Sequence, residues 1–165
     1  MGDMLIVTLT LLAALGSGLV GGVFFGFSTF VMKALARLEP GHGLLAMQSI
    51  NRAVLNPWFL GAFLGTGALA LAATTAWLYR WPTNGAAAAV VGCGCYVVGT
   101  VMVTTRGNVP KNMAIASLSP EDPDSARLWA DYVRRWTALN HVRAASALVA
   151  SAAYMLALVH WPPLS

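Results

Sequence analysis

Charged residues are scarce in this sequence. Only 10% of its 165 residues are Asp, Glu, Lys or Arg, while 58% are hydrophobic. A soluble domain carries about 25% charged residues, so this chain has too few of them to cover a water-facing surface. The composition predicts an integral membrane protein made of one domain, residues 1–165. It also argues against a nucleic-acid partner, because a net charge of +4 in such a chain supplies no soluble basic face.

Cysteine and the familiar catalytic motifs are nearly absent too. Cys93 and Cys95 are separated by one glycine, which is neither a zinc spacing nor a thioredoxin-like pair, so we interpret them as packing residues. No phosphate-binding loop, nucleophile elbow or dinucleotide fingerprint occurs. No carboxylate stands at a ligand-like spacing from His141, so we expect no metal site, although a single-histidine haem ligand at His141 stays open. The N-terminus carries Asp3 and no basic region, so we expect no cleavable signal peptide of the usual form.

Four apolar segments are long enough to cross about 30 Å of hydrocarbon. They lie at residues 5–32, 58–79, 86–104 and 139–161. No Gly or Pro interrupts the stretch that leads into the fourth segment, so we predict one helix over 126–161, embedded in the membrane from about residue 139. The predicted fold class is all-α: an integral membrane four-helix bundle whose fourth helix has an amphipathic cytoplasmic extension.

Glycines recur at four-residue spacing in two of these segments. Gly18, Gly22 and Gly26 form one such seam and Gly61 and Gly65 form another. Small residues at this spacing let membrane helices approach closely. We expect the seams to serve helix packing, and they offer a route to a homo-oligomer.

Basic residues are distributed unevenly between the connections. Lys33, Arg37 and Arg52 follow the first segment, Arg106, Lys111, Arg127, Arg134 and Arg135 follow the third, and Arg80 alone follows the second. Positively charged loops stay in the cytoplasm. We therefore place residues 33–56 and 105–138 in the cytoplasm and both termini outside, in what we expect to be a bacterial inner membrane.

A stripe of large and polar residues leads into the fourth segment. Trp129, Tyr132, Trp136, Asn140 and Arg143 are spaced by three or four residues and therefore share one helix face. An ionisable side chain at membrane depth indicates function, so this face should line a pocket. For Arg143 the alternative is that it extends to the interface, where its charge meets water.

Amides gather near the same membrane face. Pro110 cannot donate a backbone hydrogen bond and disfavours helical geometry at Val109, so N-V-P-K-N at 108–112 predicts an ordered turn that presents Asn108 and Asn112. Gln48 and Asn51 share a face of a short helix over 44–52, for which a solvated loop helix is the simpler interpretation.

Two further residues complete the candidate site. Phe27, with its neighbours Phe24 and Phe30, faces either lipid or an apolar pocket. His141 is the only histidine near the cluster and is therefore the natural general base near neutral pH. It points about 120° away from the stripe on an ideal helix, so we expect it at the edge of the pocket.

The sequence resembles the anthrone oxygenase family, small four-helix membrane proteins of which most have no assigned substrate. The resemblance covers nearly the whole chain and rests on G-x-F-F-G-F-S-T-F-V-M at 22–32, M-Q-S-I-N at 47–51, N-V-P-x-N at 108–112 and W-x-x-Y-x-x-x-W-x-x-x-N-H-x-R at 129–143. It implies that Asn108, Asn112, Trp129, Tyr132, Trp136, Asn140, His141 and Arg143 are the positions to carry over. Lys111 departs from the apolar residue expected there.

This resemblance implies oxidation of an anthrone to an anthraquinone with O₂ in a polyketide pathway. A flat apolar aromatic would partition into the bilayer and suit a pocket walled by Trp and Phe. Its anion can pass an electron to O₂ without a bound cofactor. The resemblance then makes His141 the base and makes Arg143, Asn140 and Asn108 the donors to the oxyanion.

A non-catalytic role competes with the enzyme. The chain could bind a lipid or a small hydrophobic ligand, or act as an assembly subunit through its glycine seams. Convergence of the polar residues around one closed pocket favours an enzyme, while polar residues scattered along the rim favour a scaffold.

Overall fold

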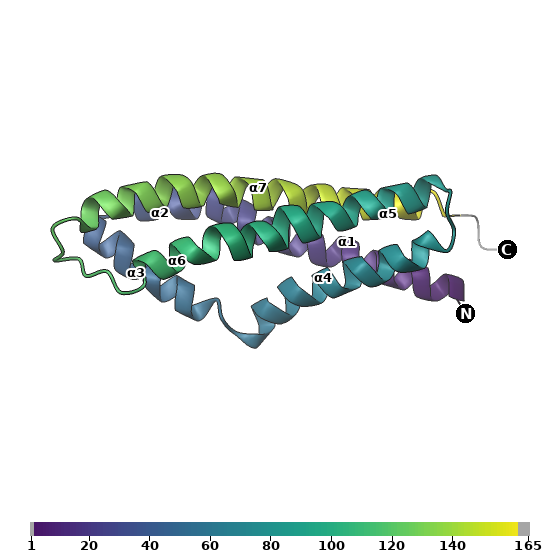
Figure 1. Ribbon diagram of the computed structural model, residues 1–165, viewed down its shortest axis with the longest axis horizontal. Helices are drawn as coiled ribbons and strands as arrows, with labels where there is room; N and C mark the ends of the chain where they lie inside the picture. Colours follow the sequence, from purple (N-terminus) through teal and green to yellow (C-terminus); the bar gives the residue numbers. More distant parts are fainter. Residues whose placement is uncertain (1, 162–165) are drawn as a thin grey trace.

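The computed structural model describes residues 2–161 (Figure 1). Four helices in this range are long and apolar enough to cross a membrane: Gly2–Ala36, Pro57–Leu78, Asn84–Ile115 and Ser125–Val159. They run along one long axis and form a bundle, which confirms the all-α four-helix membrane architecture. We call the end of the bundle that carries residues 40–53 and 109–135 the α3 end, and the opposite end, with residues 2 and 161, the terminal end.

The first long helix is extended by a π-helical turn. It consists of α1 (Gly2–Gly26), the π-helical segment η1 (Phe27–Val31) and α2 (Met32–Ala36). It therefore reaches beyond the predicted 5–32 at both ends. The short helix α3 (Pro40–Ala53) follows and contains the predicted stretch 44–52.

The second and third helices form the expected hairpin. Asn56 caps α4 (Pro57–Leu78) by accepting a hydrogen bond from the backbone N–H of Phe59 at 2.9 Å, and Pro57 occupies the first turn, where its missing N–H costs nothing. Thr83 caps α5 (Asn84–Gly94) in the same way through the backbone N–H of Ala86 at 3.2 Å.

The third helix does not end at residue 104, and N-V-P-K-N is not a turn. The chain continues from α5 through the π-helical segments η2 (Cys95–Met102) and η3 (Thr104–Asn108) into α6 (Val109–Ile115). Val109 keeps helical angles and donates its N–H to the carbonyl of Thr104, five residues back. Because of this wider hydrogen-bond register, Pro110 fits in the first turn of α6 without ending the helix. The predicted turn at 108–112 was therefore wrong.

The fourth helix is a single element, α7 (Ser125–Val159), 35 residues long. This confirms that the amphipathic stretch and the apolar segment form one continuous helix. The predicted stripe keeps its phase along it, because all five of its members are buried.

Small residues and a few hydrogen-bonded aromatics hold the terminal end together. Trp77 donates its indole N–H to the hydroxyl of Thr10 at 3.0 Å, and the hydroxyl of Tyr154 donates to the carbonyl of Ala70 at 3.0 Å. These contacts tie α4 to α1 and α7 to α4. Alanines fill the space between them, so the helix backbones lie close together.

The glycines of the two seams differ in whether they pack against another helix. A Cβ on Gly18 would lie 3.2 Å from the hydroxyl of Ser151, so this glycine packs against α7. Gly22, Gly61 and Gly65 have no atom within 4 Å of such a Cβ. They do not serve packing inside this chain, and a homo-oligomer through them stays a prediction.

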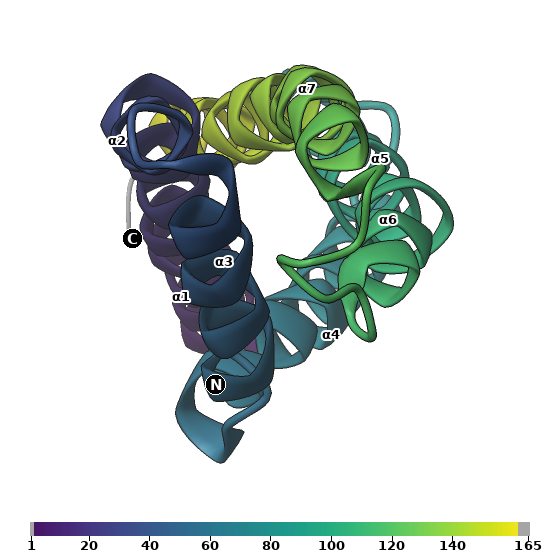
Figure 2. The ribbon, with the colours of Figure 1, turned by 90° about the vertical axis from the view of Figure 1, so that its left-hand side faces the viewer.

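The α3 end is closed by a second apolar cluster and a loop. Met32, Leu44, Met47, Ile115 and Trp129 pack there between α2, α3, α6 and α7. Figure 2, which faces this end, shows the loop at 116–124 crossing between α3 and α6. In that loop the hydroxyl of Ser119 donates to Glu121 and holds the pKa of this carboxyl below its usual range.

Candidate functional site

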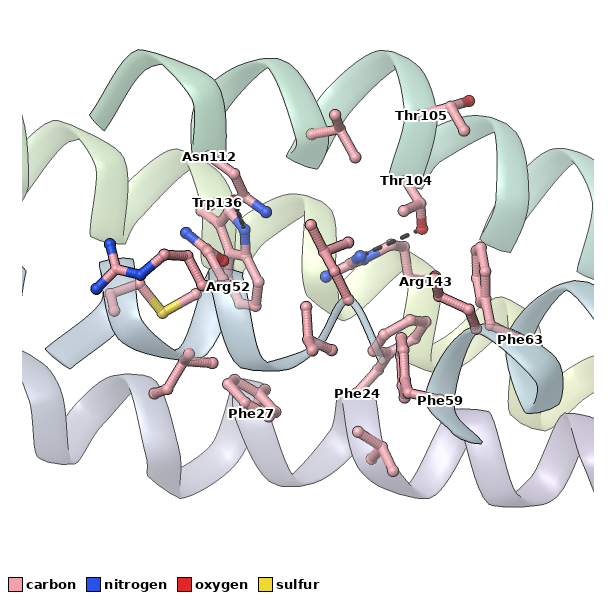
Figure 3. Close-up of a pocket in the computed structure, with 18 of the residues that line it drawn as sticks. Phe24, Phe27, Arg52, Phe59, Phe63, Thr104, Thr105, Asn112, Trp136 and Arg143 are labelled. Carbon is pink, nitrogen blue, oxygen red and sulfur yellow. Dashed lines mark hydrogen bonds between the residues drawn. The ribbon is translucent and has the colours of Figure 1, made fainter. Parts of the chain in front are cut away.

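A cavity of about 540 Å³ lies inside the bundle at the level where the predicted stripe turns from aromatic to polar. Its volume falls within the roughly 300–1,000 Å³ typical of small-molecule sites. Aromatic rings from three helices form its walls, and Figure 3 shows them around Arg143: Phe24, Phe27, Phe59, Phe63 and Trp136. Phe24 lies edge-on to Phe59 and Phe63, with ring centroids 6.3 and 6.2 Å away. Such walls suit a flat apolar ligand.

Arg143 supplies the only full positive charge deep in this cavity among the described residues. Only 4% of the residue is exposed. Its guanidinium lies over the ring of Phe24, 4.1 Å from the centroid, and 5.1 Å from the centroid of Trp136. In the described part of the chain, no carboxylate forms an ion pair with it. Two aromatic faces stabilise the cation only in part, so the site favours an anionic ligand atom beside Arg143.

The hydrogen bonds of Arg143 fix its orientation and leave one of its three nitrogens without a partner. Its Nη1 donates to the hydroxyl of Thr104 at 3.2 Å, as Figure 3 shows, and its Nη2 donates to the amide oxygen of Asn140. Its Nε is buried and has no partner in the structure. A buried donor without a partner carries a free-energy cost that a ligand acceptor would relieve.

Asn140 lies behind Arg143 and outside the cavity lining. It is completely buried. Its amide nitrogen donates to the carbonyl of Phe24 and to the hydroxyl of Ser28, both at 2.6 Å. The π-helical segment η1 begins three residues after Phe24. Asn140 therefore joins α7 to the first helix at this segment and positions Arg143.

Asn112 presents its donor group to the cavity. Its amide oxygen accepts hydrogen bonds from the hydroxyl of Tyr132 at 2.9 Å and from the indole N–H of Trp136 at 2.8 Å. Because the oxygen is occupied, the amide N–H₂ of Asn112 is the group left for a ligand. Asn51 also lines the cavity, and its amide nitrogen is buried without a partner. The polar lining thus consists mainly of hydrogen-bond donors.

Three predicted residues serve the frame of the site. Asn108 donates its amide N–H₂ to the backbone carbonyl of Trp136 at 3.2 Å. Gln48 borders the cavity, yet its amide nitrogen donates hydrogen bonds to the backbone carbonyls of Ile115 at 2.7 Å and Leu118 at 2.9 Å. Trp129 packs at the α3 end, stacked on Tyr132 with ring centroids 5.6 Å apart.

His141 does not lie at the edge of the cavity, in contrast to the expectation. It is exposed, and it borders a separate shallow depression between α7 and the first helix, together with Lys33 and Arg134. The reason is helical geometry. His141 lies one residue after Asn140 and two before Arg143, so its side chain is rotated about the helix axis by about 100° from that of Asn140 and by about 200° from that of Arg143. The structure gives no support to His141 as the base that acts on a ligand in the cavity.

Several lining residues were not identified from the sequence. Phe59 and Phe63 stack with a centroid distance of 6.1 Å, and Thr104 contacts Arg143. The sequence contains only weak indications that these three residues line a cavity. The spacing of the two phenylalanines by four residues places them on one helix face, and Thr104 precedes N-V-P-K-N by one turn of a helix that was predicted to end there.

Metal-binding side chains do not cluster in this structure. Within residues 2–161, no three His, Cys, Asp or Glu residues are grouped so that they could hold a metal ion. The described residues that line the cavity include no His, Cys, Asp or Glu. Its polar groups are instead amides, hydroxyls and guanidinium groups.

The fold defines a small four-helix integral membrane protein, and the cavity lies inside its helix bundle. A family model described as anthrone oxygenase matches residues 55–153. The chain therefore belongs to the anthrone oxygenase family. No curated protein and no solved structure matches it.

Proposed function

We propose that this protein oxidises a flat lipophilic aromatic of the anthrone type with O₂, in the cavity beside Arg143. The observation that carries the proposal is the position of Arg143. A cation without a carboxylate partner lies between Phe24 and Trp136 in a cavity that otherwise fits an apolar ring system. Family membership agrees with this reading.

The reaction converts the central methylene of the anthrone to a ketone. Water or hydroxide takes one methylene proton, and the guanidinium of Arg143 stabilises the resulting oxyanion. The anion passes one electron to O₂, and the carbon radical combines with the superoxide to form a peroxide. Loss of the second methylene proton with cleavage of the O–O bond yields the ketone. One oxygen atom of O₂ enters the anthraquinone and the other leaves as water.

The other residues of the site have supporting roles. Asn140 fixes the position of Arg143, and the donor groups of Asn112 and Asn51 face oxygen atoms at the other end of the ligand. The α3 end lies in the cytoplasm in this proposal, because most basic residues are there. The reaction requires no resident metal or cofactor.

Oxidation of added anthrone by the purified protein in lipid nanodiscs tests the proposal. We expect one O₂ consumed for each anthraquinone formed, at a rate above that of protein-free nanodiscs. Arg143→Gln should lower kcat/KM by roughly 100-fold or more, as the loss of an oxyanion donor does elsewhere. Arg135→Gln is the control, because Arg135 is exposed on the same helix and pairs with Asp131 at 2.8 Å. Equal rates for Arg143→Gln and the parent would contradict the proposal.

A non-catalytic ligand-binding protein is the second candidate. It is favoured by the absence of any His, Cys, Asp or Glu among the described lining residues, since a binding site needs no base. Saturable binding of anthrone to the nanodiscs without O₂ consumption would support this alternative.

A further inference from the structure

We infer that the cavity opens sideways into the bilayer, between α4 and α6, and that its ligand enters from the lipid phase. The inference rests on the proposed function and deepens it, because a substrate that arrives by this route must dissolve in lipid. It rests on how the cavity is closed at one end and open at its side.

The end of the cavity nearest the α3 end is closed by protein. Gln48 donates to the backbone carbonyls of Ile115 and Leu118, and these two bonds join α3 to the end of α6. Beyond them, the buried side chains of Leu44, Met47 and Trp129 fill the space between the helices. A solute that came along the bundle axis from the α3 end would have to cross this apolar cluster to reach Arg143.

The side of the cavity is bordered by exposed apolar residues. Leu55, Leu64, Val109 and Met113 line the cavity and are 69, 56, 39 and 71% exposed. Leu55 and Leu64 lie just before and within α4, while Val109 and Met113 belong to α6. Residues that both line a cavity and remain exposed mark its opening. Arg52 and Thr105 are the polar residues that also line the cavity and are exposed, so the border of this opening is mainly apolar.

The arrangement of α4 produces the gap. The helix packs closely against α1, α5 and η2, towards the terminal end. Figure 1 shows its first turns diverging from α6 as the chain leaves α3. The phenylalanines of these turns, Phe59 and Phe63, then face the cavity.

The opening lies at the depth of the hydrocarbon on the α3 side of the membrane, just inside the interface. Trp58 is 89% exposed and Arg52 lies one short loop before it, which is the pairing of aromatic and cation found at a membrane interface. Leu64 lies six residues further along α4, about 9 Å deeper at 1.5 Å per residue. An aromatic dissolved in the lipid beside α4 would meet the opening directly.

A thiol in the cavity tests this route without any anthrone. Thr104→Cys, in a chain with Cys93→Ala and Cys95→Ala, places a thiol beside the guanidinium of Arg143, which favours the reactive thiolate. In liposomes, we expect the lipid-soluble N-pyrenylmaleimide to label this thiol and the water-soluble sulfonate reagent MTSES to leave it unlabelled.

Blocking the opening provides the decisive comparison. Leu64→Trp combined with Met113→Trp should slow labelling by N-pyrenylmaleimide at least ten-fold. Leu71→Trp is the matched control, because Leu71 lies two turns further on the same face of α4, is 54% exposed and does not line the cavity. It should label at the parent rate. Thermal unfolding of each variant checks that it is folded.

Other outcomes would overturn the lateral route. Rapid labelling by the sulfonate reagent, an unchanged rate after blocking, or no labelling by either reagent each contradicts it. These results are independent of turnover, so a protein that does not oxidise anthrone could still show the lateral opening, and an active enzyme could lack it.

Discussion

Asn140 accepts a hydrogen bond from the guanidinium of Arg143 while its own amide N–H₂ group is held by the first helix. The two residues are three apart on α7, so one turn of helix sets their distance. The oxygen of Asn140 can point only at Arg143, because Phe24 and Ser28 take its nitrogen. A neutral amide thus orients a buried cation without cancelling its charge.

Asn140→Asp tests whether the positive charge of Arg143 matters, because it neutralises this charge while Arg143 keeps its place in the cavity. The carboxylate is nearly isosteric with the amide and should form an ion pair with Arg143, which neutralises the cation in the cavity. We expect binding of an anionic aromatic such as anthracene-2-carboxylate to fall at least ten-fold. Fluorescence titration of the ligand into nanodiscs measures this. The second carboxylate oxygen faces the carbonyl of Phe24 and cannot donate to it, so thermal unfolding is used to check that the variant is folded.

Asn140→Leu is the control for that substitution, because it removes the hydrogen bonds and leaves the cation without its partner. We expect it to lower the free energy of unfolding by about 2 kcal/mol, which urea or thermal unfolding in detergent would detect. If Asn140→Asp binds the anion as tightly as the parent does, the positive charge of Arg143 does not recruit the ligand.

Much of this site follows from helix periodicity. The spacing of Trp136, Asn140 and Arg143 fixes a common face, and an all-α membrane bundle offers such a polar face few places except the interior. The burial of all three agrees with that reasoning. Trp136 and Arg143 line the cavity and the other members of the stripe do not. This division depends on packing with α1 and α6, so the sequence of α7 alone does not predict it.

The sequence-based errors have local physical causes. Pro110 predicts a helix end when only the α-helical register is considered, and the π-helical register of residues 104–108 removes the conflict. His141 was chosen for its chemistry, although its helical angle already separated it from the stripe. The side opening was missed because it depends on how α4 diverges from α6.

Gly99 tests the packing of the third helix against α7. A Cβ on Gly99 would lie 2.2 Å from the hydroxyl oxygen of Ser146 and 2.5 Å from its Cβ, so Gly99→Ala should destabilise the protein by about 1–3 kcal/mol. Adding Ser146→Gly removes both clashing atoms and should restore most of the loss. The double-mutant cycle is read from thermal unfolding in detergent.

Gly61→Ala is the matched substitution at an open position, where no atom lies within 4 Å of the added Cβ. It should be neutral or stabilising, since alanine favours a helix over glycine by up to about 1 kcal/mol. A clear loss of stability at Gly61 would instead show that another copy of the chain packs on this face of α4.

The orientation of the chain in the membrane follows from its basic residues and can be tested directly. Between the membrane segments, the α3 end carries Lys33, Arg37, Arg52 and five further basic residues, and the terminal end carries Arg80. We expect the α3 end to face the cytoplasm.

In a chain with Cys93→Ala and Cys95→Ala, a cysteine introduced by Asn84→Cys should react with an impermeant maleimide added outside intact cells. A cysteine at Arg127, which is exposed in the structure, should react only after the cells are opened. The reverse pattern would place the α3 end outside. The labelling of these two positions is independent of the ligand and of any activity.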